Sequence, residues 1–344
     1  MRVSLLSFRA AVSATLLLSL SLTATLTTTV SADAFTTEPV LHLSRTITRA
    51  VLSEEQAEGQ GARVRRSIGR PELRNHDPFL MLDEFLVGKN GGFPDHPHRG
   101  FETVTYMLEG QFRHEDFAGH SGVIGPGDVQ WMTAGRGIVH SEMPVFPGGE
   151  GGEGGEKALT KAHGLQLWIN LPKEHKMCDP QYQELLDSQI PRSEPQSGVT
   201  IKVIAGESHG VQSKVYTRTP TLFLDITMEP HKVVEQNLPL SYTGFIYMLS
   251  GKTYLGEKEE PFVGEAHHTL TLSSSDGVKE AVRIETKEEG ARFVFIAGQP
   301  LNEPIVQHGP FVMNTHEEIY ETFFDFRNAV NGFERANQWR SSAN

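Results

Sequence analysis

The chain contains 344 residues, and its 31 basic and 43 acidic residues give a formal net charge of −12. Such an acidic surface should not attract nucleic acid, so we expect no direct nucleic-acid partner. The length suggests two domains of ordinary size. The 38% hydrophobic content, with 33 glycines and 19 prolines, fits a β-rich, turn-rich globular protein. The single cysteine, Cys178, excludes an intramolecular disulfide bond.

Residues 1–33 form a candidate targeting segment. Arg2 and Arg9 precede an uncharged run over residues 10–32, which ends in a small-residue Val-Ser-Ala sequence. The run is long enough to span a bilayer, but its many serines and threonines make it a poor membrane helix, so we expect no stable span after processing. We interpret it as a presequence for the secretory route or for a plastid. A mitochondrial or chloroplast transit peptide is the alternative, because no acidic residue precedes Asp33.

The next segments predict the strands of a first barrel. Residues 41–74 are interpreted as the entry into this barrel, with their arginines on solvated strand edges. A basic patch for a partner is the alternative. Residues 79–86 form an apolar, strand-like run that contains Asp83 and Glu84, which we interpret as part of a turn or barrel rim. A supporting role for these two acids behind a metal site is the alternative. Residues 103–108 are rich in β-forming side chains and predict another strand.

Two pairs of potential metal ligands, His96/His98 and His140/Glu142, each have i, i+2 spacing. Alternate residues of an extended strand point to the same side, about 7 Å apart along the chain, so one strand can offer two ligands to one point. Three imidazoles and a carboxylate suit iron, manganese, zinc, nickel or copper better than calcium or magnesium. One His-x-His alone is a weak signal, but a second pair beside another glycine-rich turn strengthens it. The spacing therefore predicts a shared metal site.

Other acidic and imidazole side chains nearby are rival ligands. His114, Glu115, Asp116 and His120 form a polar cluster, but they flank a glycine-containing turn and we interpret them as loop residues. Glu102 follows the His-x-His pair and is the next candidate after the two pairs. It could be a ligand, or an acceptor that orients an imidazole.

The middle of the chain predicts a connection between two barrels. Residues 147–156 contain Gly-Gly-Glu three times, a flexible acidic composition that cannot form a core and indicates a loop insertion. Residues 173–198 are polar and contain three prolines, which indicates a linker. Within the linker, residues 181–186 are a candidate for a short helix.

Residues 199–300 alternate in the manner of strands and repeat part of the first barrel. Tyr247-Met248-Leu249-Ser250-Gly251 echoes Tyr106-Met107-Leu108-Glu109-Gly110, which places a second barrel here. The matching upstream stretch has no His-x-His, so we expect this barrel to lack metal. His267 and His268 are adjacent and point to opposite faces of a strand, so they offer one ligand at most. Residues 317–339 predict a terminal helix.

Two long segments contain the predicted ligands: His96-Pro97-His98-Arg99-Gly100-Phe101-Glu102-Thr103-Val104-Thr105-Tyr106 and Gly127-Asp128-Val129-Gln130-Trp131-Met132-Thr133-Ala134-Gly135-Arg136-Gly137-Ile138-Val139-His140-Ser141-Glu142. Both segments resemble the pirin family. Supporting similarity includes Gln307-His308-Gly309-Pro310-Phe311-Val312-Met313-Asn314, and the resemblance runs from about residue 41 to about residue 333. Pirins are two-cupin proteins that bind iron in the N-terminal cupin. The resemblance implies His96, His98, His140 and Glu142 as the iron ligands, with Glu102 as the runner-up.

The resemblance and the strand pattern together predict an all-β fold, a tandem of two antiparallel jelly-roll barrels with a C-terminal helix. We expect an N-terminal cupin that binds metal over residues 41–172, a linker over 173–198, and a metal-free C-terminal cupin with the helix over 199–344.

The resemblance implies two classes of function. One is a dioxygenase that cleaves quercetin-type flavonols with Fe(II), although another divalent transition metal could replace the iron. Glu142 could then act as the base on the flavonol hydroxyl. The other is an iron- and redox-dependent regulatory protein that binds a protein partner, as a transcriptional coregulator does, without catalysis. A phenolic small molecule or a protein is thus the expected partner of what we expect to be a monomer. A cytoplasmic or nuclear location would follow from the resemblance alone.

Overall fold

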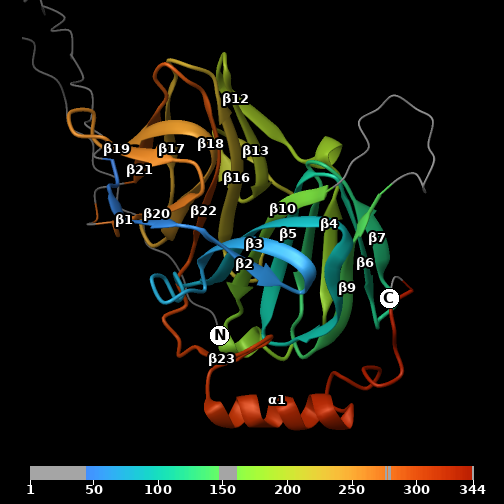
Figure 1. Cartoon of the computed structure of the whole chain (residues 1–344). Helices are drawn as coiled ribbons and strands as arrows, with labels where there is room; N and C mark the ends of the chain where they lie inside the picture. Colours follow the sequence, from blue (N-terminus) through green and yellow to red (C-terminus); the bar gives the residue numbers. More distant parts are fainter. Residues whose placement is uncertain (1–43, 147–160, 276, 278–279, 343–344) are drawn as a thin grey trace, which may run out of the picture. The chain divides into compact units, whose positions relative to one another are not determined.

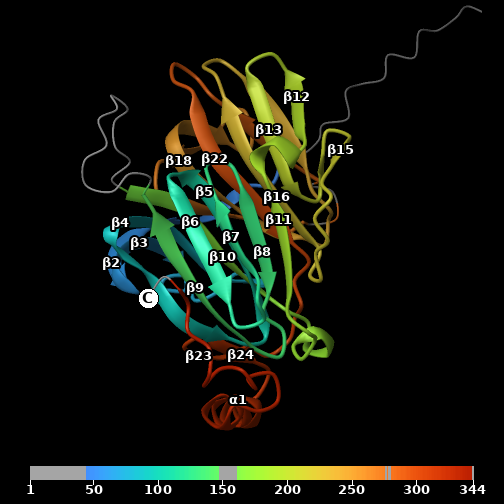
Figure 2. The same cartoon turned by 90° about the vertical axis from the view of Figure 1, so that its right-hand side faces the viewer.

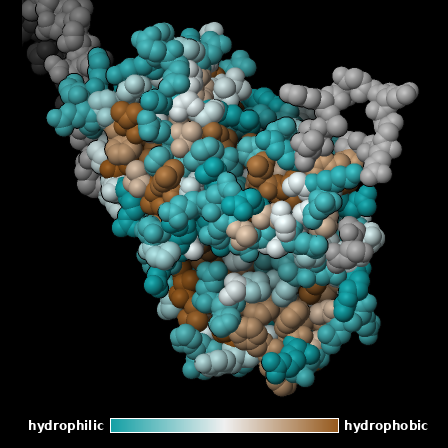
Figure 3. Space-filling model, viewed as in Figure 1, coloured by the Kyte–Doolittle hydropathy of each residue, from teal (hydrophilic) through white to brown (hydrophobic). Residues whose placement is uncertain are grey.

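The computed structural model describes residues 44–146, 161–275, 277 and 280–342. The expected targeting segment and the Gly-Gly-Glu insertion lie outside these residues. Within the described ranges, no helix is both long enough and apolar enough to cross a bilayer. Hydrophilic residues cover most of the face shown in Figure 3, as the acidic composition leads one to expect.

The first of two ten-stranded antiparallel sheets in the described chain has the order β11-β8-β5-β10-β4-β9-β6-β7, with β3 and β2 extending it from β4 (Figure 2). Its strands are β2 (Glu54–Glu58), β3 (Gln60–Ile68), β4 (Phe79–His98), β5 (Phe101–Glu109), β6 (Gln111–Asp116), β7 (Ser121–Ile124), β8 (Val129–Thr133), β9 (Ile138–Val145), β10 (Lys161–Asn170) and β11 (Gln181–Leu185).

The second sheet has the order β1-β20-β18-β22-β16-β13-β12, and β17, β19 and β21 pair off this path (Figure 1). Its strands are β1 (Ile47–Leu52), β12 (Arg192–Gln196), β13 (Val199–Ala205), β16 (Thr221–Met228), β17 (Val233–Asn237), β18 (Thr243–Leu255), β19 (Phe262–Glu265), β20 (His268–Leu272), β21 (Ala281–Glu285) and β22 (Ala291–Gly298). The ribbons β14 (Glu207–Ser208) with β15 (Val211–Gln212), and β23 (Val306–His308) with β24 (Phe311–Met313), are separate.

Strand β1 belongs to the second sheet, although we expected this part of the chain to enter the first barrel. It pairs with β20 in antiparallel register, with Ala50 opposite Leu270. A strand at the edge of a sheet leaves backbone N–H and C=O groups unpaired, and β1 satisfies those of β20. The chain then passes to β2 and β3 of the first sheet, so residues 47–52 tie the two halves of the chain together.

The linker contains strands rather than the expected short helix. Gln181–Leu185 is strand β11, which pairs with β8, and Arg192–Gln196 is strand β12, which pairs with β13. The short 3-10 turns Lys173–His175 and Asp187–Gln189 lie before and between them. The helix prediction was therefore wrong, because the free edge of β8 supplies a partner that the local sequence does not reveal.

The core explains why several strands are buried on both faces. One cluster of buried side chains joins the two sheets, with Trp131 and Leu167 from the first and Phe223, Phe245 and Val294 from the second. Further clusters fill each barrel separately. A strand that faces its own barrel on one side and the shared core on the other is buried on both faces. Its sequence is therefore mostly apolar, without polar alternation, as in residues 79–85.

The C-terminal segment packs beside the ribbon β23–β24 as the helix α1 (His316–Asn328), drawn in red in Figures 1 and 2. Thr315 and Glu318 form a capping box at its start. The helix ends before the expected residue 339, because Ala329 takes a left-handed conformation with φ of 52°. The predicted fold class, two tandem antiparallel barrels with a C-terminal helix, is confirmed.

Candidate metal centre

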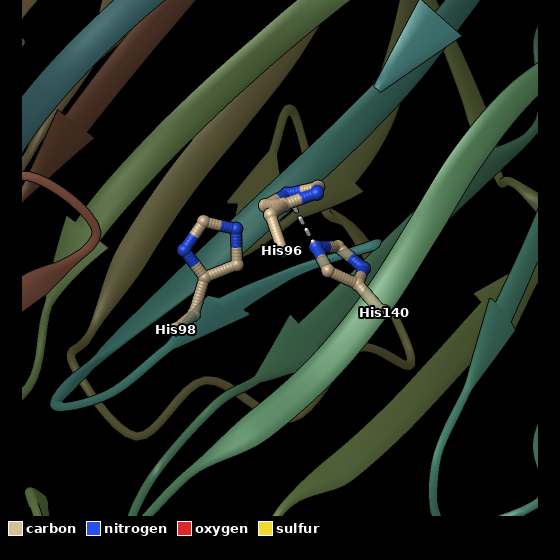
Figure 4. A group of neighbouring side chains, drawn as sticks. All are labelled: His96, His98 and His140. Atoms are coloured by element: carbon tan, nitrogen blue, oxygen red, sulfur yellow. Dashed lines mark hydrogen bonds between the residues drawn. The ribbon is translucent and has the colours of Figure 1, made fainter. Parts of the chain in front are cut away.

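The strands β4 and β9 deliver the four predicted ligand side chains. The two strands are antiparallel, with His96 directly opposite His140 and His98 opposite Ile138. Residues directly opposite in an antiparallel pair have Cβ atoms only about 5 Å apart on the same face. As a result, the imidazoles of His96, His98 and His140 point toward one another (Figure 4), and ligand atoms from the three rings lie within 4.8 Å of one another.

The separation of two ring nitrogens matches the geometry of a metal site. His96 Nε2 lies 3.0 Å from His140 Nε2. Two nitrogens bound to one ion at about 2.1 Å and at about 90° to each other would lie about 3.0 Å apart. His96 Nδ1 lies 2.8 Å from the carbonyl oxygen of Pro94, to which it can only donate. In a neutral ring, this leaves the Nε2 lone pair of His96 available to a metal.

The electrostatics of the cluster favour neutral imidazoles. Burial, together with the nearby ring of His96, lowers the pKa of His98 well below its usual range. Burial and the rings of His96 and His98 do the same to the pKa of His140. Protonating either ring would place an uncompensated cation in the protein interior. Neutral imidazoles with free lone pairs are the state that divalent transition metals require, so these residues fit such an ion.

Glu142 lines the same cavity as His96 and His98, but no oxygen of its carboxylate belongs to the cluster within 4.8 Å. Thr105 Oγ1 donates to its Oε1 at 2.8 Å, and Gln166 Nε2 donates to its Oε2 at 3.2 Å. Burial raises the pKa of the carboxyl, which is only 3% exposed. The structure therefore places three of the four expected ligands together and holds the fourth beside them.

The runner-up, Glu102, is engaged elsewhere. It lies in β5, and its carboxylate accepts hydrogen bonds from Trp131 Nε1 at 3.1 Å and from Thr133 Oγ1 at 2.7 Å. Burial raises the pKa of this carboxyl as well. Neither donor is an imidazole, and Glu102 is not in the cluster of the three histidines.

The rival group around residue 114 has a different arrangement from the expected loop. His114, Glu115 and Asp116 lie in strand β6, and His114 is buried with its Nε2 2.5 Å from Glu184 Oε1. Asp116 shapes the following turn, because its Oδ1 accepts from the backbone N–H groups of residues 118, 119 and 120. The loop interpretation holds for His120 alone, whose ring Nδ1 contacts Asp116 Oδ2 at 3.0 Å.

A cavity of about 490 Å³ opens beside the histidine cluster. Its apolar wall includes Val64, Met81, Phe85, Phe93 and Trp168. Its polar lining includes Glu58, Arg66, Asp83, Asp95, Glu142, Gln166 and Gln307. Such a mixture of aromatic surface and a few polar groups is typical of a small-molecule site.

Sequence reasoning missed the part that Arg66 and Asp83 play in this cavity. Arg66 lies opposite Asp83 in the pairing of β3 with β4, and it is bonded to that buried carboxylate rather than placed on a solvated edge. Asp83 and its neighbour Glu84 are buried in the middle of β4, not on a barrel rim. The signal that could have predicted this pairing was the presence of two acidic residues inside an apolar run, because buried acidic side chains need partners.

The two adjacent histidines of the second half, His267 and His268, have other partners. His267 Nδ1 lies 2.8 Å from Glu84 Oε2, which also accepts a hydrogen bond from the hydroxyl of Tyr247. His268 Nδ1 lies 3.1 Å from the carbonyl oxygen of Ala266. Both rings are thus engaged with protein oxygens.

Comparisons with known proteins agree with this architecture. A family model described as Pirin matches residues 61–169, and one described as Pirin C-terminal cupin domain matches residues 223–332. Human Pirin is 55% identical over 300 residues, which cover 87% of this chain and 98% of that protein. The Pirin-like protein of Solanum lycopersicum is 52% identical over 297 residues, covering 86% of this chain and 96% of its own length.

A solved structure extends the comparison. The crystal structure of quercetin 2,3-dioxygenase from Acinetobacter baumannii superposes with a TM-score of 0.72 and 31% identity, covering 83% of this chain and 98% of that one. The two matching family models fall on the two barrels described above, and the high identity extends over nearly the whole length of the relatives. The chain therefore belongs to the pirin family.

Proposed function

We propose that this chain is a non-haem iron dioxygenase that acts on quercetin-type flavonols, with Fe(II) held by His96, His98, His140 and Glu142. The observation that carries the proposal is the convergence of three imidazoles beside a cavity with an aromatic wall. The similarity to a quercetin 2,3-dioxygenase supports the reaction class. Since three imidazoles and a carboxylate also suit other transition metals, the choice of iron rests on the family.

A bound Fe(II) would supply Lewis acidity and redox chemistry with dioxygen. The protein supplies the base and the surroundings. Glu142 takes the proton of a flavonol hydroxyl on its carboxylate. Thr105 Oγ1 donates to Oε1 at 2.8 Å and Gln166 Nε2 donates to Oε2 at 3.2 Å, and each oxygen keeps a further lone pair for the incoming proton. Burial raises the pKa of Glu142, and a carboxylate within reach of the flavonol hydroxyl can act as a general base.

The residues around Glu142 fix its orientation and exclude water. Gln166 and Thr105 hold the carboxylate from one side. Phe85 and Trp168 offer flat apolar surface to the rings of a flavonol. A planar, largely apolar substrate that offers a hydroxyl to Glu142 fits these walls better than a charged sugar or nucleotide would.

The test is purification under nitrogen with metal analysis, followed by measurement of oxygen uptake with flavonols. The expected result is about one iron per chain and oxygen consumption that depends on both iron and flavonol. Iron-loaded protein that consumes no oxygen with any flavonol would contradict the proposal.

A regulatory binding protein remains the second candidate, and one feature favours it. Arg99, which follows His98, is buried and donates from Nη1 to Asp325 Oδ2 of α1 at 2.8 Å. This contact connects the ligand-bearing segment with a surface helix. An iron-dependent change in the surface around α1, in protein without oxygenase activity, would favour this alternative.

A further inference from the structure

The guanidinium of Arg66 in β3 lines the cavity beside the histidines. Its Nε donates to Asp83 Oδ1 at 2.8 Å, and its Nη2 donates to Asp83 Oδ2 at 2.7 Å. Nη2 also donates to Glu58 Oε2 at 2.8 Å. A two-pronged contact with a buried carboxylate fixes the plane of the guanidinium more firmly than a single contact would.

These contacts leave one nitrogen of Arg66 unused. A guanidinium carries five N–H groups, and the three on Nε and Nη2 are taken by Asp83 and Glu58. The two N–H groups of Nη1 have no protein acceptor among the residues that the structure describes. Because Arg66 lines the cavity, a ligand there can supply the missing acceptor.

The charge of the cavity restricts the kind of acceptor. Four carboxyl residues, Glu58, Asp83, Asp95 and Glu142, line it together with Arg66. An anionic group on the ligand would therefore face an excess of negative charge. An uncharged oxygen, such as that of a hydroxyl, can accept from Nη1 without this repulsion, and its own proton can be donated to a neighbouring carboxylate.

We propose that Arg66 is a specificity-determining residue, which selects ligands that carry an uncharged hydroxyl on the ring that does not face the histidines. The inference rests on the proposed function, because it assumes a flavonol whose other end lies at Glu142 and the three imidazoles. We call the flavonol ring that does not face the histidines the pendant ring. A pendant ring without a hydroxyl would leave Nη1 of Arg66 without a partner and bury it away from water. That lost hydrogen bond should weaken binding.

The test measures equilibrium binding of two flavonols to metal-loaded protein under nitrogen. Quenching of tryptophan fluorescence reports the binding, since Trp168 lines the cavity. One flavonol carries hydroxyls on its pendant ring and the other lacks them. Wild type should prefer the hydroxylated flavonol. Arg66→Lys keeps a cation for Asp83 and Glu58, but it has no group equivalent to the Nη1 amino group of arginine. The affinity for the hydroxylated flavonol should therefore fall about tenfold. The affinity for the other flavonol should not change.

Arg63→Lys is the matched control, because Arg63 lies in the same strand, pairs with Glu55 at the surface and does not line this cavity. It should behave as wild type. Should Arg66→Lys fail to fold, the double variant Arg66→Met with Asp83→Leu removes both charges of this ion pair and should lose the same preference.

Equal weakening of both flavonols, or no change in either, would overturn the role of Arg66. Wild type that binds neither flavonol would overturn this inference and the proposed function together. Wild type that binds both with the expected preference, yet consumes no oxygen, would overturn the proposed function alone.

Discussion

The hydroxyl of Tyr106 in β5 donates a hydrogen bond of 2.5 Å to Asp225 in β16, and so joins the first barrel to the second. Its counterpart in the sequence repeat, Tyr247 in β18, donates at 2.6 Å to Glu84 in β4, in the opposite direction. The repeated Tyr-Met-Leu motif thus makes two reciprocal contacts between the barrels. Burial raises the pKa of both tyrosines, so both hydroxyls keep their protons and act as donors.

Replacement of Tyr106 by phenylalanine should destabilise the protein by about 1–3 kcal/mol, since it removes a buried hydrogen bond to a charged acceptor. Asp225 would retain its ion pair with Arg292, which limits the loss. Denaturant unfolding measures the effect. Tyr320→Phe is the control, because Tyr320 is 70% exposed on α1 and should change stability little. A similar loss of unfolding free energy in Tyr106→Phe and Tyr320→Phe would show that the hydrogen bond between the barrels does not contribute to stability.

Glu84 should make stability depend on pH. Burial favours its protonated form, but hydrogen bonds from His163 and Tyr247 and the charge of His267 outweigh burial and lower its pKa from 4.5 to about 2. A depressed carboxyl pKa stabilises the folded state above pH 4.5, and this contribution, about 3 kcal/mol, is lost as pH falls toward 2.

The free energy of unfolding, measured between pH 6 and pH 2.5 for wild type and Glu84→Gln, checks this effect. The variant should be the less stable protein at pH 6, and the two curves should approach each other as the pH falls. Curves that stay parallel over this range would contradict the assignment to Glu84.

The fold and the grouping of the histidines could be predicted, because both depend on local sequence patterns. Alternation fixes which side chains share a strand face, so the spacing of His96 with His98 already placed both on one side. The repeated motif containing Tyr247 revealed the second barrel in the same way. The prediction that Glu142 joins the histidines was less complete. Alternation gives its face, but not the hydrogen bonds from Thr105 and Gln166 that hold its carboxylate.

Features that depend on distant partners could not be predicted. The sequence of residues 47–52 does not reveal that the free edge of β20 accepts it. The pattern of residues 181–185 likewise does not show that β8 needs a neighbour. The pair of Arg66 with Asp83 depends on the register of β3 with β4, and a shift of one residue would send the arginine to the other face.

His98 should be essential for metal binding. His98 is 2% exposed and lies in the three-histidine cluster, so His98→Ala should lower the bound metal more than tenfold. His120→Ala should retain the metal, because His120 contacts Asp116 at the surface turn. Metal analysis after anaerobic purification measures both variants. Equal loss of metal in the two would contradict the assignment of His98 as a ligand.

Asp325 should support the metal site from α1. Asp325→Asn removes the charge that pairs with buried Arg99, next to His98, and so loosens the anchor of this segment. We expect a loss of stability of several kcal/mol, together with weaker metal binding, both measurable on the intact chain. Asp179→Asn is the control, because Asp179 forms an exposed ion pair with Arg136. Metal affinity equal to that of wild type in folded Asp325→Asn would show that α1 does not support the site.

Glu142 should separate metal binding from catalysis. Glu142→Gln keeps the size of the side chain and one carbonyl oxygen but removes its charge and basicity. Because the three imidazoles remain, the variant should retain part of its metal. It should nevertheless lose about 10²–10⁴-fold in flavonol turnover, the usual contribution of a general base. Oxygen uptake per bound metal measures this loss.

Glu102→Gln is the matched control for this last variant. Glu102 is an equally buried glutamate, but it accepts hydrogen bonds from Trp131 and Thr133 and lies outside the histidine cluster. A folded Glu102→Gln protein should therefore keep its metal and its turnover. Oxygen uptake at the wild-type level in metal-loaded Glu142→Gln would exclude Glu142 as the base. Loss of turnover in Glu102→Gln alone would move that role to Glu102, against the placement of its carboxylate.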